Sequence, residues 1–355
     1  MATANKRILY LDYLRIISAL WVIVIHVCCT PWLKINVTSF GWGTLTFYDS
    51  LAQCAVPVFF MISGALFLNP QKELPTKRIY TKYIPPLLVS FAVWSLIYII
   101  FNKDYTKGPY TILKNLLKGS FHMWFIPAMI GLYMMLPLLR KITESRELTR
   151  YFLLLFVILV YLVPTAEKVI ALIPLHGFSS VSKLLSDFTD TFIFRMVMGY
   201  SGFMVLGHFL HTHEFSKKGR RIVYVLGIFG FLFTLSATIL LSLSKNHATD
   251  TFMTGTSLGV GLFAVSIFTF FKYFSRNIEH SEKKVKFISL ISDSTYGIYL
   301  VHIIVIRLFK KKLLIDAMFF RPIVTVPLLA IAVFIVSLLI VRIIKLIPKI
   351  NKYIV

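Results

Sequence analysis

Long apolar blocks separated by short polar loops recur along the whole chain of 355 residues. Most blocks run for roughly 18–22 residues, the length that a helix needs to cross the hydrocarbon core of a bilayer. Because backbone groups in lipid must be hydrogen-bonded within their own segment, the blocks are expected to be helical. We predict an all-α, polytopic membrane helical bundle that forms a single integral-membrane domain over residues 1–355. The pattern places about ten transmembrane helices at 9–29, 47–68, 83–101, 121–139, 151–163, 191–210, 222–243, 251–271, 287–308 and 322–345.

The first block contains ionisable residues that are costly to bury in a membrane. Arg15 and His26 are eleven positions apart, so at about 100° per residue they return to within roughly 20° of the same helix face. Along the helix axis they are about 16 Å apart. Asp12 lies one turn before Arg15 and can pair with it. A lone membrane histidine is more often an interhelical hydrogen-bonding group than a catalyst, whereas a polar stripe on one face is typical of a path or a reaction site.

The second block contains the segment PVFFMISGALF, residues 57–67. We expect Pro57 to kink the helix and Gly64 to allow close contact with a neighbouring helix. Ser63 can satisfy backbone groups that the kink leaves free. On physical grounds alone this segment is a packing motif.

Two later segments combine aromatic and titratable residues. His122 and Trp124 precede a span that we expect Pro127 and Pro137 to interrupt. Trp124 is interpreted either as an interfacial anchor or as a stacking surface for a sugar ring. Near the end of the chain, polar residues recur at helical spacing, either as a sealed polar face or as part of a site: Asp293, Tyr296, Tyr299 and His302.

The formal charge of +23 resembles that of a nucleic-acid-binding protein, but the positions of the cations argue against nucleic acid as a partner. Alternate assignment of loops puts about 23 Lys and Arg residues on the side of the N-terminus and about 12 on the other, so the positive-inside rule predicts that both termini are cytoplasmic. Lys77, Arg78 and Lys82 lie in an inward loop just before Pro85 and Pro86. These cations either hold the phosphates of a polyanionic cofactor such as coenzyme A or only set the topology.

Metal and soluble catalytic chemistry have no support in the sequence. The three cysteines, Cys28, Cys29 and Cys54, have no metal-ligand spacing and are interpreted as small packing residues. No metal site is predicted. The chain contains no P-loop, HExxH or dinucleotide fingerprint.

Together these segments resemble the acyltransferase type 3 family of membrane acyltransferases. Four ordered features carry the resemblance: Arg15 and His26 in the first helix, a Phe-Phe-x-x-Ser-Gly motif in the second, a Trp-Phe-Leu-like motif in the fourth and an Ile-Tyr-Leu-x-His motif near the end. In this chain they are matched by Arg15 and His26, then Phe59, Phe60, Ser63 and Gly64, then Trp124, Phe125 and Ile126, and finally Ile298, Tyr299, Leu300 and His302. The chain resembles the stand-alone type, without an SGNH hydrolase-like domain.

The resemblance implies transfer of an acetyl or other short acyl group from cytoplasmic acyl-CoA to a hydroxyl of a cell-envelope glycan or lipid-linked sugar. His26, Arg15 and Asp12 are then the candidate catalytic residues, with His26 as general base. Acetyl-CoA is the expected co-substrate, with Lys77, Arg78, Lys82 and Ser63 as its candidate binding residues. The acceptor is assigned to His122, Trp124, Tyr299 and His302. The expected location is a bacterial cytoplasmic membrane, with the lipid bilayer as a partner.

A transporter or exporter of a glycan or small metabolite is the alternative, because polar residues in a bundle of broken helices suit it as well. The two hypotheses differ in one observation, since only an acyltransferase consumes the thioester. A membrane sensor or scaffold is a third class, which so many intramembrane polar groups disfavour. The sequence leaves open the identity of the acceptor, the acyl chain length and whether His26 forms an acyl intermediate.

Overall fold

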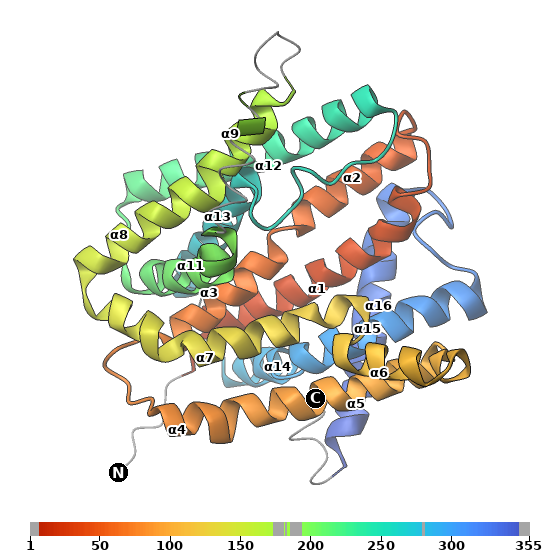
Figure 1. Cartoon of the computed structure of the whole chain (residues 1–355), viewed down its shortest axis with the longest axis horizontal. Coiled ribbons are helices and arrows are strands. Elements are labelled where there is room, and N and C mark those ends of the chain that lie inside the picture. Colours follow the sequence, from red (N-terminus) through yellow and green to blue (C-terminus); the bar gives the residue numbers. More distant parts are fainter. Residues whose placement is uncertain (1–6, 173–180, 182, 185–193, 279–280, 348–355) are drawn as a thin grey trace.

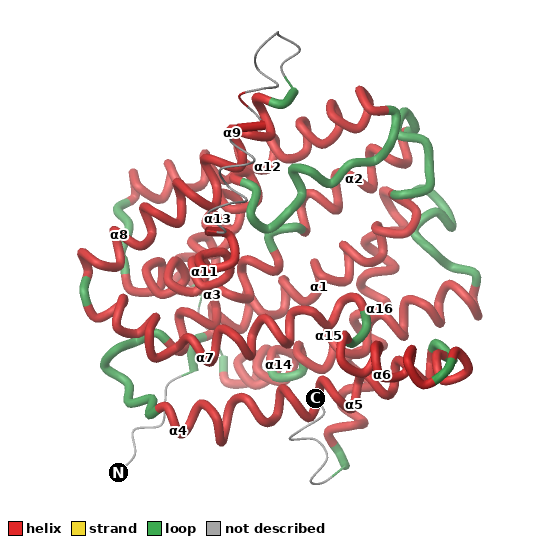
Figure 2. Tube along the Cα trace, viewed as in Figure 1, coloured by secondary structure: helices red, strands yellow, loops and turns green. Residues whose placement is uncertain are grey.

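The computed structural model describes the chain except for residues 1–6, 173–180, 182, 185–193, 279–280 and 348–355. The described residues form helices and connecting loops, and no strand occurs among them (Figure 2). The predicted all-α bundle is therefore confirmed. In Figure 1, α1 and α3 cross the middle of the bundle, α4 and α5 run along its lower edge and α12 runs along its upper edge.

Several helices are extended by a short 3-10 or π segment. The helices are α1 (Leu9–Trp32), α2 (Phe40–Ala52), α3 (Ala55–Phe67), α4 (Thr76–Arg78), α5 (Ile84–Phe101), α6 (Pro109–Lys118), α7 (Phe125–Glu144), α8 (Arg146–Phe156), α9 (Val163–Ile170), α11 (Phe194–Thr212), α12 (Lys217–Lys245), α13 (Leu258–Phe274), α14 (Glu282–Ser292), α15 (Thr295–Leu308) and α16 (Pro322–Lys345). The π segment Ile79–Tyr83 joins α4 to α5, Val157–Leu162 joins α8 to α9, and Phe309–Leu313 follows α15.

Within the described residues, seven segments are long and apolar enough to cross a membrane, or eight if the bent pair of α14 and α15 counts as one. The short predicted block at 151–163 extends into its flanks as expected, because α8 and α9 form one span over Arg146–Ile170. The helices α11 and α13 correspond to two further predicted blocks but are not in that set. The exact number of about ten stays a prediction.

Two of the predicted spans are broken, the one over 47–68 and the one over 287–308. The helix expected over 47–68 divides into α2 and α3 at Gln53 and Cys54. The break lies just before Pro57, whose ring disfavours a helical carbonyl four residues earlier, at Gln53.

The expected interruption of the fourth span is wrong, because α7 continues through Pro137. Pro127 causes no break either, since it lies in the first turn of α7, where no helical N–H is required.

The prediction of a single helix over 287–308 is also wrong. The chain bends by 53° between α14 and α15. Lys345 Nζ donates to the backbone carbonyl of Asp293 at 2.6 Å, and Ser294 Oγ donates to the carbonyl of Leu290 at 2.9 Å. Side-chain donors therefore take carbonyl groups at the bend, and aspartate and serine are residues that compete with helical hydrogen bonds in this way.

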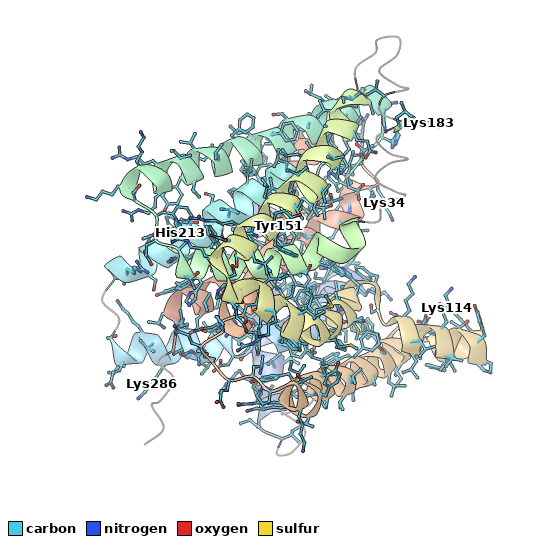
Figure 3. The ribbon with its side chains drawn as sticks, turned by 60° about the vertical axis from the view of Figure 1, so that its left-hand side comes forward. Lys34, Lys114, Tyr151, Lys183, His213 and Lys286 are labelled. Atoms are coloured by element: carbon cyan, nitrogen blue, oxygen red, sulfur yellow. The ribbon has the colours of Figure 1, made fainter. Side chains whose placement is uncertain are left out.

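Residues near the two ends of the described chain meet at one end of the bundle. Arg7 donates to the Asp293 carboxylate at 2.7 Å, and Lys345 donates to the Asp293 carbonyl at 2.6 Å. In Figure 3, Lys286 and His213 lie on the left of the view, whereas Lys34, Lys114 and Lys183 lie on the right. The predicted inward loops and the predicted outward loops thus occupy opposite ends. Which end faces the cytoplasm stays a prediction.

The helices α3 and α11 meet backbone to backbone. A Cβ atom added at Gly64 would lie 1.8 Å from the carbonyl oxygen of Met204, and one added at Gly207 would lie 2.1 Å from the carbonyl oxygen of Met61. No side chain fits at either position without moving one helix. The expected role of Gly64 as a site of close helix contact is confirmed.

Gly64→Ala is expected to destabilise the protein by about 1–3 kcal/mol, because the new methyl group forces α3 and α11 apart. The matched control is Gly131→Ala on α7, where an added Cβ meets nothing within 4 Å. This control should be neutral or stabilising by up to about 1 kcal/mol. Thermal unfolding of the two purified variants measures the difference, and equal melting temperatures would contradict the close packing of α3 against α11.

Candidate active site

A cavity of about 300 Å³ lies between α1, α3, α7 and α15. Apolar and aromatic side chains form most of its wall, and a few polar groups interrupt them, which is typical of small-molecule sites. The polar lining residues are Arg15, His26, Ser63, His122, Tyr133, Thr295, Tyr296 and Tyr299. Trp124 also lines it. Six predicted site residues, contributed by four separate segments, therefore share one cavity.

Arg15, Val22 and His26 all line this cavity from α1. Arg15 and His26 thus lie on one face of the helix, as their spacing predicts. Ser63 faces the same space from α3, and its hydroxyl donates to the carbonyl of Phe59 at 3.2 Å. Ser63 therefore satisfies a backbone group of its own helix, as the sequence suggested, while its side chain remains on the cavity wall.

Three histidines from three different segments form a cluster at the His26 side of the cavity. The ring centroids of His26 and His302 are 5.1 Å apart, those of His122 and His302 are 5.3 Å apart, and those of His26 and His122 are 6.2 Å apart. Tyr299 joins α15, which also contains His302, to the segment just before α7, because its hydroxyl donates to the carbonyl of His122 at 2.6 Å. The sequence identified each histidine, and the fold brings them together.

The buried histidines keep unused hydrogen-bonding atoms. His302 Nδ1 lies 2.6 Å from the carbonyl oxygen of Tyr299. A carbonyl oxygen only accepts, so Nδ1 carries the proton and Nε2 has a free lone pair. That Nε2 atom and both ring nitrogens of His122 have no hydrogen-bond partner of good geometry among the described residues. Leaving such atoms unsatisfied costs roughly 1–3 kcal/mol each, and they suit a site that awaits a polar substrate.

Asp12 belongs to a network of ion pairs beside Arg15 rather than to the cavity wall. Arg7 Nε lies 2.7 Å from its carboxylate, Ser292 Oγ donates to it at 2.6 Å, and Arg15 Nη1 is 3.5 Å away. Asp12 is 2% exposed. The carboxylates of Asp293 and Asp12 raise the pKa of Arg7, which stays protonated at any physiological pH. This network fixes the start of α1 against α14 and leaves Arg15 at the edge of the cavity.

Lys77, Arg78 and Lys82 lie outside the cavity, exposed on the segment that leads into α5. Lys82 Nζ lies 6.0 Å from the ring centroid of Tyr83. The Tyr83 ring in turn contacts two cavity-lining residues, with centroid distances of 5.2 Å to Phe67 and 6.3 Å to Tyr133. The cationic segment is therefore connected to the cavity through one aromatic contact. The prolines that follow coincide with a π segment before α5, as their effect on the helix start suggested.

The sequence did not identify Tyr133 or Tyr98 as site residues. Tyr133 lines the cavity from α7. Tyr98 contacts the His122 ring with a centroid distance of 5.0 Å and donates to the carbonyl of Leu300 at 2.8 Å. No local pattern marks either tyrosine, because each is one aromatic residue in an apolar helix. Only the packing of α5 and α7 against α15 reveals them.

The arrangement suits proton transfer in a largely apolar space. A neutral imidazole at His26 can accept a proton, and an arginine at the other end of the same stripe can bind an anionic or carbonyl group. Among the described residues, no group of three or more His, Cys, Asp or Glu side chains is arranged to hold a metal ion.

Comparison with known proteins places the chain in a family. The family described as "Acyltransferase domain" (Acyl_transf_3) matches residues 8–342. The chain is also similar to a protein of Enterococcus faecalis named amino-acid racemase, with 25% identity over 246 residues. That match covers 67% of this chain and 33% of the relative, so the chain spans about a third of the length of this relative. No solved structure matches. Because the family covers nearly the whole chain, from residue 8 to residue 342, the chain belongs to this acyltransferase family.

Proposed function

We propose that this chain is a membrane O-acyltransferase that moves an acetyl or other short acyl group from cytoplasmic acyl-CoA to a hydroxyl of a cell-envelope glycan or lipid-linked sugar. The observation that carries the proposal is a single cavity with Arg15 and His26 on one helix face. The chain then acts as a multi-pass protein of a bacterial cytoplasmic membrane, with the bilayer as its surroundings.

The donor enters at the Arg15 end. Lys77, Arg78 and Lys82 bind the phosphates of coenzyme A, because exposed cations beside the cavity attract a polyanion. The pantetheine arm then extends past Arg15 toward His26. The two residues are about 16 Å apart along the helix, which is of the order of the length of that arm. Ser63 lines the path between them.

Arg15 binds a phosphate or an amide carbonyl of the arm through its planar guanidinium group. Its contact with Asp12 is long, at 3.5 Å, whereas Arg7 approaches the same carboxylate to 2.7 Å. The stronger pairing of Asp12 with Arg7 leaves the Arg15 guanidinium available to a ligand. Asp12 is thus a positioning residue for Arg15 in this scheme.

The acceptor hydroxyl reaches His26 from the side of His122 and His302. Its oxygen attacks the thioester carbonyl, so that a C–O bond forms as the C–S bond breaks. The hydroxyl proton passes to the imidazole of His26 and from there to the departing thiolate. His122, Tyr299 and His302 surround this position and bind the acceptor, with Trp124 as an apolar surface beside it.

His26→Ala is expected to reduce acyl transfer by roughly 10²–10⁴-fold, because the general base is lost while the cavity remains. The assay measures the appearance of free coenzyme A and of acylated product with purified protein. The matched control is His247→Ala, an exposed histidine in the loop after α12, which should behave as wild type. A folded His26→Ala protein with near-normal turnover would contradict the base role, and its melting curve establishes that it is folded.

Neutralising Lys77, Arg78 and Lys82 to Gln is expected to raise the KM for acetyl-CoA about tenfold at low salt. The kcat should change less, because distant cations bind ground state and transition state alike. The effect should shrink at high salt, where charges are screened over about 8–10 Å.

The matched control removes three charges elsewhere, by neutralising the exposed run Lys310, Lys311 and Lys312. That variant should keep the wild-type KM. Cysteine-accessibility labelling of the loop before α5 tests the topological alternative. Coenzyme A binding as tight as in wild type, with only the loop topology changed, would show that the donor assignment is wrong.

A further inference from the structure

A second, more polar cavity of about 180 Å³ lies at the end of the bundle opposite Lys77. It lies between the end of α5, the connection that contains α6, and α15. Its principal lining residues are Ser95, Asn102, Asp104, Asn115, Phe121 and Arg307. The cavity is smaller than the roughly 300–1,000 Å³ of sites for drug-sized ligands, so it suits a single ring rather than a whole oligosaccharide.

Ion pairs and hydrogen bonds hold the polar groups of this cavity in place. Asp104 accepts from Lys107 Nζ at 2.7 Å and from Asn115 Nδ2 at 2.9 Å. The hydrogen bond from Lys107 lowers the pKa of Asp104, so the carboxylate is ionised at neutral pH. Arg307 donates to the Asn102 side chain. Gly119 has a φ of 71°, a conformation that side chains rarely adopt, and turns the chain toward Phe121.

The cavity contains a buried hydroxyl group that awaits a partner. Ser95 is 1% exposed, and its Oγ atom has no hydrogen-bond partner in the described part of the chain. A buried hydroxyl without a partner is costly, so a polar ligand that reaches it gains a hydrogen bond without displacing another. Among the described residues, the Arg307 guanidinium donates to Asn102 and forms no ion pair.

The wall of this cavity adjoins the histidine cluster. Phe121 lines the polar cavity, and its ring centroid is 5.4 Å from that of His26. Tyr98 also lines it and contacts the His122 ring at a centroid distance of 5.0 Å. The two cavities therefore lie on either side of a thin aromatic partition at His26 and His122.

We propose that this second cavity binds one sugar ring of the acceptor, next to the hydroxyl that is acylated. The proposal rests on the proposed function for its role in the reaction. Amide, carboxylate and guanidinium groups bind the adjacent hydroxyls of a sugar through paired donors and acceptors, and Phe121 offers an apolar face to the ring.

Binding of methyl β-D-glucopyranoside and of methyl N-acetyl-β-D-glucosaminide to the purified full chain, without acetyl-CoA, tests the proposal. Saturation-transfer NMR gives a Kd for each glycoside. Arg307→Lys is expected to raise the Kd about tenfold or more, since lysine loses the planar fork. Ser95→Ala, which removes one hydroxyl and no structural bond, should raise it about three- to tenfold.

The matched control is Lys114→Gln, because Lys114 projects from α6 at the same end of the protein and does not line the cavity (Figure 3). It should bind as wild type does. The assignment is overturned if neither glycoside binds, or if Ser95→Ala and Arg307→Lys bind as wild type does. Because acetyl-CoA is absent, glycoside binding can fail while thioester consumption succeeds, and the reverse, so the two proposals are tested separately.

Discussion

The structure depends on how a membrane bundle accommodates an arginine and three histidines away from bulk water. A charged side chain at the centre of a membrane helix costs about 2.5–3.5 kcal/mol by insertion scales. Here Asp12 lies 3.5 Å from Arg15 and is itself held by Arg7 and Ser292. This network ties the start of α1 to α14, and it fixes the register at which His26 meets His122 and His302. Arg15 and Asp12 are thus stabilised by ion pairs and hydrogen bonds, whereas His122 and His302 keep ring nitrogens without a hydrogen-bond partner among the described residues.

This asymmetry divides the protein into two chemical environments. On the Arg15 side, a mainly apolar cavity suits an acyl chain and a flexible thioester arm, and the exposed cations Lys77, Arg78 and Lys82 lie outside it. On the far side, amide, hydroxyl and charged groups suit a hydroxylated ring. His26, His122 and Phe121 separate the two. In the proposed mechanism the donor thioester and the acceptor hydroxyl meet at His26, so neither substrate has to traverse the bundle.

Much of this arrangement was predictable, because helical periodicity is local. The spacing of Arg15 and His26 predicted that both lie on one helix face, and the glycine at position 64 predicted a close helix contact. The bend at Asp293 was not predictable, since it depends on Lys345, which is 52 residues away in the chain. The polar cavity around Arg307 was not predicted, for the same reason. Its partners come from a loop about 200 positions earlier, and no single segment of the sequence contains enough of the site to show it.

In the proposed mechanism, the thioester donor and the acceptor reach His26 from opposite ends of the bundle. Sealed vesicles with the protein in one known orientation test this two-sided arrangement. Acetyl-CoA labelled in the acetyl group is supplied only on the side of Lys77, and a methyl glycoside only on the side of Lys114. Labelled acetyl glycoside is expected in the glycoside compartment and free coenzyme A in the other, in equal amounts. Movement of unmodified glycoside across the vesicle with no thioester consumed would contradict it and would indicate a transporter.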